Sequence, residues 1–286
     1  MNLVTDILSY EFNQRALLVA VMIGFMNGYV GGYVVLRRGA LFASSLSHTL
    51  FPGVALGALI AGINPYSALI GAFVMAMVIG LGSEGIAANS RIDRDASMAV
   101  LVTAGMAAGL LLLRRVATNI RIEDYLFGNI LGVADWDLWF VFMAGGVVLS
   151  ALILFQRPLQ IHVFSPELAA SQGLSVSLLD YLMSAAVVIT MVASLQAVGT
   201  LLAIGLLVAP AATMYLYLDS TGVILWGGGV LGVLIAVATV IISNVVNIPT
   251  GPAMMILLAS VFVAGFALSP RYGLLAALRT RHVPDH

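Results

Sequence analysis

The sequence predicts an all-α integral membrane protein with about nine transmembrane helices, forming a single domain over residues 1–286. Of its residues 61% are hydrophobic and only 9% are charged, whereas a soluble domain has about 25% charged residues. The mean hydropathy is +1.08. Apolar runs long enough to cross a bilayer, about 20 residues each, recur between Ala16 and Leu268. The lipid bilayer is therefore the expected surrounding of this chain.

Each predicted span is an apolar segment bounded by polar residues, glycine or proline. The segments are 16–36, 46–62, 66–82, 96–113, 137–156, 178–197, 199–217, 221–243 and 252–268. Two of them meet between Gln196 and Gly199, where the count is most sensitive to the boundary chosen. A further apolar segment, 124–132, is too short to cross the bilayer, so we expect a re-entrant or interfacial helix there.

The arginines predict the orientation in the cell (inner) membrane, because cytoplasmic segments are enriched in basic residues. An extracellular N-terminus and a cytoplasmic C-terminus place most arginines inside. Those inside are Arg37, Arg38, Arg91, Arg94, Arg157, Arg271, Arg279 and Arg281, and those outside are Arg15, Arg114, Arg115 and Arg121.

The composition excludes several function classes. All the basic residues are arginine, so the chain lacks the lysine of a phosphate-binding Walker loop and of a Schiff-base enzyme. Cysteine is absent, which excludes thiolate ligands, disulfides and thiol catalysis. The formal net charge of −1 gives no reason to expect a nucleic-acid partner. If transport uses ATP, another polypeptide must hydrolyse it.

His48 is the histidine that falls inside a predicted span; the others, His162, His282 and His286, fall in predicted cytoplasmic segments. Ionisable groups at membrane depth are functional candidates, and neutral imidazole binds several transition metals. Ser44 precedes His48 by one helical turn, and Pro52 cannot donate a hydrogen bond to the His48 carbonyl. Two interpretations remain: metal or proton handling by His48 and Ser44, or a histidine that bonds a neighbouring helix.

The segment from Ser165 to Gly173 predicts a complete short cytoplasmic helix. Ser165 is a typical N-cap, Pro166 suits the first helical position, and Glu167 favours the positive end of the helix dipole. Gly173 is typical of a left-handed C-terminal stop. So short a helix is marginal alone in water, so it either docks on a partner or is a capped connector.

Glycines and prolines in the spans suggest close packing and hinges. Gly24, Gly28 and Gly32 repeat every fourth residue and permit close approach of another helix, within the chain or in a partner. Pro210 is expected to break the seventh helix. The candidate hinge or gate residues are Pro52, Gly53 and Pro210.

Around His48 the sequence Ser47-His48, followed by Pro52-Gly53-Val-Ala55, resembles the metal-type ABC permease family, importers of zinc, manganese or iron. The resemblance covers nearly the whole chain. Further matches are Val35-Leu-Arg-Arg38, Tyr125-Leu-Phe-Gly128, Pro166-Glu-Leu-Ala169 with Gly173, Leu195-Gln-Ala-Val-Gly199, Ala209-Pro-Ala-Ala-Thr213, Pro249-Thr-Gly251 and Ser269-Pro-Arg271. Each match is weak alone, and their shared order and spacing make the assignment specific.

The resemblance implies a fold similar to the vitamin B12 importer's membrane half. It implies a second permease, as a homodimer or heterodimer, two cytoplasmic ABC ATPase subunits, and an extracellular metal-binding protein. The chain would be a transport subunit and not an enzyme, with Mn2+ or Zn2+, or else Fe2+, as cargo rather than as a resident cofactor. Residues 165–173, which include Ala169, match the family's coupling helix, and His48 matches a histidine associated with the metal.

The chain departs from the family pattern at two positions, where serine replaces the usual aspartate. At Ser165 the change is mild, because serine caps a helix as well as aspartate does. At Ser44 a formal negative charge is lost beside His48. This implies weak binding suited to rapid transit, or a different second permease that supplies a carboxylate. The alternative function is a proton-coupled secondary metal carrier that uses His48.

Overall fold

The computed structural model describes residues 11–62, 64–113 and 135–270, and within them the secondary structure is helical. The predicted segment 124–132 and the arginines at 114, 115, 121, 271, 279 and 281 lie outside the described residues. In chain order the helices are α2 (Glu11–Leu36), α3 (Ala40–Ala61), α4 (Pro65–Asn89), α5 (Arg94–Leu113), α7 (Asp135–Leu154), α8 (Gln156–Phe164), α9 (Pro166–Ser171), α10 (Val176–Val198), α11 (Thr200–Tyr215), α12 (Thr221–Val246) and α13 (Thr250–Leu268).

Among the described residues, 8 helices are long and apolar enough to cross a membrane, and α11 is a shorter apolar helix of 16 residues. The chain is therefore a multi-pass membrane protein of the predicted all-α class. At about 1.5 Å per residue α11 rises about 24 Å, less than the roughly 30 Å of a hydrocarbon core. It begins directly after Gly199, whose positive φ of 79° makes the tight turn from α10. This turn lies where two predicted spans meet.

The predicted break at Pro210 is wrong. The α-helix α11 continues through Pro210 to Tyr215. A proline removes one backbone hydrogen bond, but membrane helices tolerate it where neighbouring helices and local adjustments satisfy the freed group. Pro210 is buried, in agreement with that explanation.

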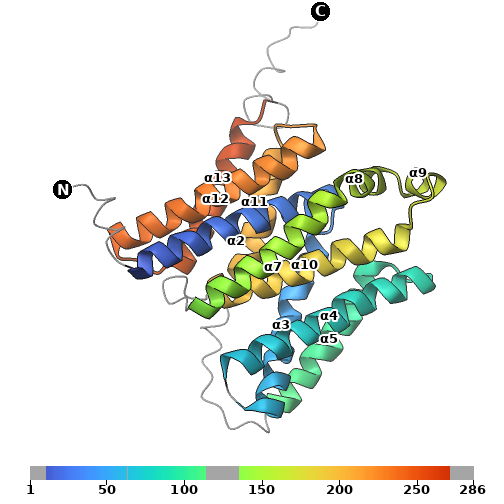
Figure 1. Cartoon of the computed structure of the whole chain (residues 1–286), viewed down its shortest axis with the longest axis horizontal. Coiled ribbons are helices and arrows are strands. Elements are labelled where there is room, and N and C mark those ends of the chain that lie inside the picture. Colours follow the sequence, from blue (N-terminus) through green and yellow to red (C-terminus); the bar gives the residue numbers. More distant parts are fainter. Residues whose placement is uncertain (1–10, 63, 114–134, 271–286) are drawn as a thin grey trace, which may run out of the picture.

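Two groups of helices form the bundle (Figure 1). In the first, α12 lies along α2, and α11 packs on α2, α12 and α13. In the second, α3, α4 and α5 pack on one another. Helix α10 contacts α2 and α11 in the first group and α3 and α4 in the second, and it also contacts α7. It therefore joins the two groups.

The glycine repeat on α2 serves packing inside the chain. A Cβ atom added to Gly28 would lie 2.1 Å from the carbonyl oxygen of Gly228 on α12, and one added to Gly24 would lie 2.7 Å from that of Gly232. Such distances leave no room for a side chain at either position. The sequence allowed a helix of the same chain or of a partner to pack on this repeat, and the structure shows that it is α12 of the same chain.

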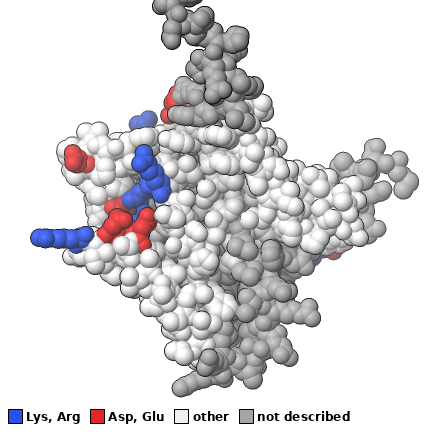
Figure 2. All heavy atoms as spheres, turned by 180° about the vertical axis from the view of Figure 1, so that it is seen from behind, with Lys and Arg blue, Asp and Glu red and all other residues white. Residues whose placement is uncertain are grey.

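Charged side chains gather at one end of the bundle. In Figure 2 most of the coloured side chains lie at one edge, and the broad white surface beside them consists of described residues without charge. That edge corresponds to the side of Figure 1 on which α8 and α9 lie. An uncharged surface of this breadth is what a bilayer requires.

Candidate functional site

His48 lies on an exposed stripe of α3. Its side chain is exposed, Ser44 and Ser45 are partly exposed, and the three share one face of the helix because their spacing is three and four residues. No hydrogen bond or ion pair joins the His48 ring to any residue that the structure describes. The interpretation as a histidine bonded to a neighbouring helix of this chain therefore does not hold within the described residues.

Three other exposed hydroxyls in the spans form hydrogen bonds within their own helix. Thr103, Ser150 and Ser260 each donate a hydrogen bond to a backbone carbonyl three or four residues earlier, over 2.7, 3.0 and 2.7 Å. These residues can face lipid at little cost. The exposed imidazole of His48 has no such bond, and an unsatisfied polar group in hydrocarbon is costly. Within the described part of the chain the imidazole has no partner, so water, a second chain or a cation would satisfy it.

The backbone beside His48 is held on two sides. A Cβ added to Gly53 would lie 2.5 Å from the Gly71 carbonyl oxygen of α4, and one added to Gly109 of α5 would lie 2.5 Å from Pro52 Cβ. Both α3 residues are buried. Glycine and proline therefore seat α3 against α4 and α5, and their predicted role as a hinge or gate stays a prediction.

The described residues do not form a closed metal site around His48. Within the residues that the structure describes, no three His, Cys, Asp or Glu side chains are grouped so that they could hold a metal ion. The chain offers one imidazole with serine hydroxyls on the same face. Such a set suits transient contact with a cation better than its retention.

The short helix α9 has the local geometry that its sequence predicts. The Oγ atom of Ser165 accepts a hydrogen bond from the Leu168 N–H, and Pro166 occupies the first turn. At the other end Gly173 adopts a φ of +78°. The N–H groups of Gly173 and Leu174 bond to the carbonyls of Ala170 and Ala169, both at 3.0 Å. This is a Schellman arrangement, and it fixes where α9 stops.

The described residues leave most of the surface of α9 uncovered. Ala169 is fully buried, whereas Leu168 is 49% exposed and Glu167 is also exposed. Helix α9 packs mainly on α8 and α10. A capped helix with one buried residue and exposed acidic and apolar side chains is suited to contact with another protein.

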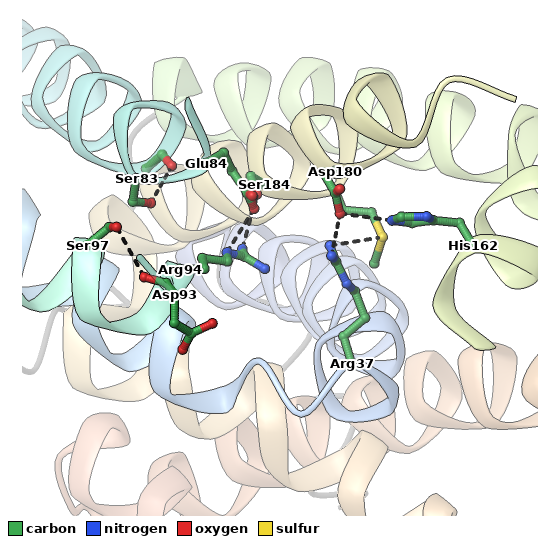
Figure 3. Close-up of polar contacts among 11 residues, drawn as sticks. Arg37, Ser83, Glu84, Asp93, Arg94, Ser97, His162, Asp180 and Ser184 are labelled. Atoms are coloured by element: carbon green, nitrogen blue, oxygen red, sulfur yellow. Dashed lines mark hydrogen bonds and ion pairs between the residues drawn. The ribbon is translucent and has the colours of Figure 1, made fainter. Parts of the chain in front are cut away.

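A carboxylate of α10 connects three helices at this end (Figure 3). Asp180 forms an ion pair with Arg37, which directly follows α2, and its Oδ1 atom lies 2.8 Å from Nε2 of His162 on α8. The His162 side chain is only 2% exposed. Arg37 also approaches the Met183 sulfur, at 3.6 Å. The spacing of these residues in the sequence gives no sign of the contact.

A second cluster lies one turn further along α10. Ser184 donates a hydrogen bond to Glu84 of α4 and accepts one of 3.0 Å from Arg94 at the start of α5. Arg94 Nε lies 2.8 Å from Glu84 Oε1. The guanidinium stands 3.5 Å above the Phe42 ring of α3, a cation–π contact. We call these two clusters, Arg37, His162, Asp180, Glu84, Arg94 and Ser184, the α10 polar network.

Sequence reasoning missed this network. Asp180 falls inside the predicted span 178–197, and Glu84 and Arg94 stand just outside the predicted spans 66–82 and 96–113. Opposite charges at the ends of neighbouring spans were the available signal. The arginine pattern predicts orientation but not which carboxylates the arginines meet.

Comparison with known proteins gives a consistent family. The model of the ABC 3 transport family matches residues 9–269. The chain is 33% identical over 271 residues to the manganese transport system membrane protein MntC of Halalkalibacterium halodurans, covering 94% of this chain and 91% of that protein. It is 33% identical over 262 residues to the manganese import system permease protein ScaB of Streptococcus parasanguinis, with 92% of both chains covered.

A solved structure agrees with these relatives. The structure of PsaBC from Streptococcus pneumoniae, in complex with Fab, superposes with a TM-score of 0.82 at 29% identity. It covers 96% of this chain and 98% of that one. The relatives are membrane proteins of manganese transport systems, and their similarity extends over the helices that carry His48 and the capped helix α9. The chain belongs to the ABC 3 transport family.

Proposed function

We propose that this chain is the permease subunit of an ATP-driven importer of divalent transition metal ions, with Mn2+ as the leading cargo. Manganese leads because the similar membrane proteins MntC and ScaB are named for manganese transport. Zn2+ and Fe2+ remain alternatives, since imidazole and oxygen ligands suit all three ions.

The observation that carries the proposal is the exposed imidazole of His48 on a membrane helix, which has no hydrogen-bond or ion-pair partner among the described residues. A second permease set against the stripe of Ser44, Ser45 and His48 would shield it from lipid and double its ligands. The metal would then pass between the two permeases, contacting both imidazoles. The serine at position 44 lowers the local negative charge and favours rapid release.

The missing lysine and the exposed helix α9 indicate which other subunits the importer would need. It has no lysine for a Walker loop, so separate cytoplasmic ATPases would hydrolyse ATP. Helix α9, with Ser165, Pro166, Glu167, Ala169 and Gly173, would be the coupling helix that docks on them. An extracellular protein would deliver the metal. In this arrangement the N-terminus is extracellular and the C-terminus cytoplasmic, in the cell (inner) membrane.

The test is uptake by proteoliposomes that contain the chain with its ATPase and binding protein. We expect Mn2+ uptake that requires ATP and is unaffected by collapse of the proton gradient. Competition with Zn2+ and Fe2+ then ranks the cargo. Uptake driven by a pH gradient without ATP would instead support the proton-coupled carrier. Family membership favours the first outcome.

A further inference from the structure

The supports of α9 determine how a movement of this helix can enter the bundle. Among the described helices α9 packs mainly on α8 and α10, and Ala169 is its one buried residue. If ATPases move α9, the displacement must therefore pass through α8 and the first turns of α10. Both of these segments carry residues of the α10 polar network: His162 on α8, and Asp180 and Ser184 on α10.

Asp180 ties these supports to the first helix group. Its Oδ1 atom contacts His162, on the last turn of α8, and also pairs with Arg37 at the end of α2. One carboxylate oxygen thus holds three segments at once. A shift of α8 or α10 cannot occur without moving or breaking a contact to α2.

Ser184 ties the same supports to the second group. Its hydroxyl connects Glu84 of α4 with Arg94 of α5, and the Arg94 guanidinium lies on the Phe42 ring. Phe42 belongs to α3, the helix that carries His48. A continuous set of contacts therefore runs from α9, through α8 and α10, to the helix of the proposed metal pathway.

Stability alone does not explain these largely buried charges. The side chains of Arg37, Asp180, Arg94 and Glu84 are 21%, 24%, 19% and 8% exposed. Replacing such pairs by well-packed apolar residues is often neutral or stabilising, whereas removal of one partner leaves an unpaired charge. The network pairs two arginines with two carboxylates, and these charges stay paired only while the helices keep their relative positions.

We propose that Asp180 and Ser184 are positioning residues that transmit movement of α9 to α3. The inference rests on the proposed function, in which α9 docks on an ATPase and α3 lines the metal path. In this proposal the first turns of α10 couple ATP hydrolysis to metal passage. Loss of either side chain would leave α9 able to move without the corresponding movement of α3.

The experiment uses the complete importer in proteoliposomes, and measures Mn2+ taken up for each ATP hydrolysed. For Asp180→Asn we expect this ratio to fall by about 2- to 30-fold, the usual range for residues that carry coupling between sites. ATP hydrolysis itself continues, because the ATPase chains are unchanged. Ser184→Ala, which removes one hydroxyl, should lower the ratio in the same direction.

The matched control is Glu11→Gln. Glu11 also forms an ion pair, with Arg15, but it is exposed and lies at the opposite end of α2. We expect a wild-type ratio for this variant. A purely structural role for the network predicts that uptake and hydrolysis fall together in Asp180→Asn, with the ratio unchanged, and this result would overturn the inference.

Failure of a variant to assemble and failure of the wild type to transport have different meanings. If Asp180→Asn does not assemble, Ser184→Ala decides the question: a lower ratio supports the inference and a wild-type ratio contradicts it. If the wild-type complex shows no ATP-dependent Mn2+ uptake, the proposed function fails. An unchanged ratio in variants that do transport leaves that function intact and rejects the role of α10 alone.

Discussion

Nε2 of His162 lies 2.8 Å from Oδ1 of Asp180, although 18 residues separate them in the chain. The contact joins the last turn of α8 to the first turns of α10, on either side of the short helix α9. Arg37 meets the same carboxylate from the end of α2. Segments that the arginine pattern places on the cytoplasmic side thus converge at one end of the bundle.

This convergence predicts the topology of the chain. Reporter fusions after Arg38, Arg94 and Gly173 should be cytoplasmic, and fusions after Gly62 and Asn247 should be extracellular. The sides of Arg38, Gly62, Arg94 and Gly173 follow from helices that each cross the bilayer once. Asn247 ends α12, which runs antiparallel to α2 because Gly24 and Gly28 face Gly232 and Gly228, so it lies on the side opposite to Arg38. The measurement is activity of a reporter that works on one side of the membrane. Fusions after Arg38 and Gly62 on the same side would contradict the assignment of α3 as a span.

A second prediction concerns the end of α9. Gly173→Val should lower coupling between ATP hydrolysis and metal uptake, because a β-branched residue is strained at a φ of +78°. The strain is worth about 1–2 kcal/mol, enough to loosen so short a helix. Gly173→Asn is the matched control, since asparagine tolerates this conformation. Equal metal-to-ATP ratios in both variants and the wild type would show that the stop of α9 is unimportant for coupling.

The contact between α2 and α12 allows a prediction of stability. Gly28→Leu should destabilise the folded chain by roughly 1–3 kcal/mol, the usual cost of overpacking, because a Cβ there meets Gly228 backbone. Gly146→Leu is the control, since no atom lies within 4 Å of a Cβ built at that helical glycine. Thermal unfolding of the detergent-solubilised protein compares them. A Gly28→Leu variant as stable as Gly146→Leu would mean that the two helices are not in contact.

Ser44→Asp tests the meaning of the missing carboxylate. If metal passes His48, an acid one turn away should bind it more tightly, so both the KM for Mn2+ and the maximal uptake rate should fall. If position 44 faces only lipid or protein, the unpaired charge should instead destabilise the fold without lowering KM. Initial uptake rates over a range of Mn2+ concentrations, together with the amount of assembled complex, separate these results.

Hydropathy was sufficient to predict the helical membrane fold but not the extent of each helix. The predicted span 66–82 stops before Glu84, whereas α4 continues to Asn89. The charge ends an apolar window, yet in the fold Glu84 is buried because Arg94 and Ser184 neutralise and bond it. Such compensation comes from other helices and leaves no local trace in the sequence.

The candidate site was predictable in part. His48 was found because an ionisable group inside an apolar run is rare, and the end of α9 because Ser165 and Gly173 act through local backbone geometry. The bond between Asn27 and Ser194, 167 residues apart, and the contacts of Asp180 depend on which helices become neighbours. Residue spacing does not determine that arrangement.

The most direct test of the central claim is metal uptake by His48→Ala in the complete importer. The account predicts that ATP-dependent Mn2+ uptake falls at least about tenfold, as for loss of groups that tune a metal site, while the amount of assembled complex stays normal. Thr103→Ala, which removes an exposed hydroxyl bonded to its own helix, should transport like the wild type. Normal uptake by His48→Ala would contradict the claim that metal passes along this face of α3.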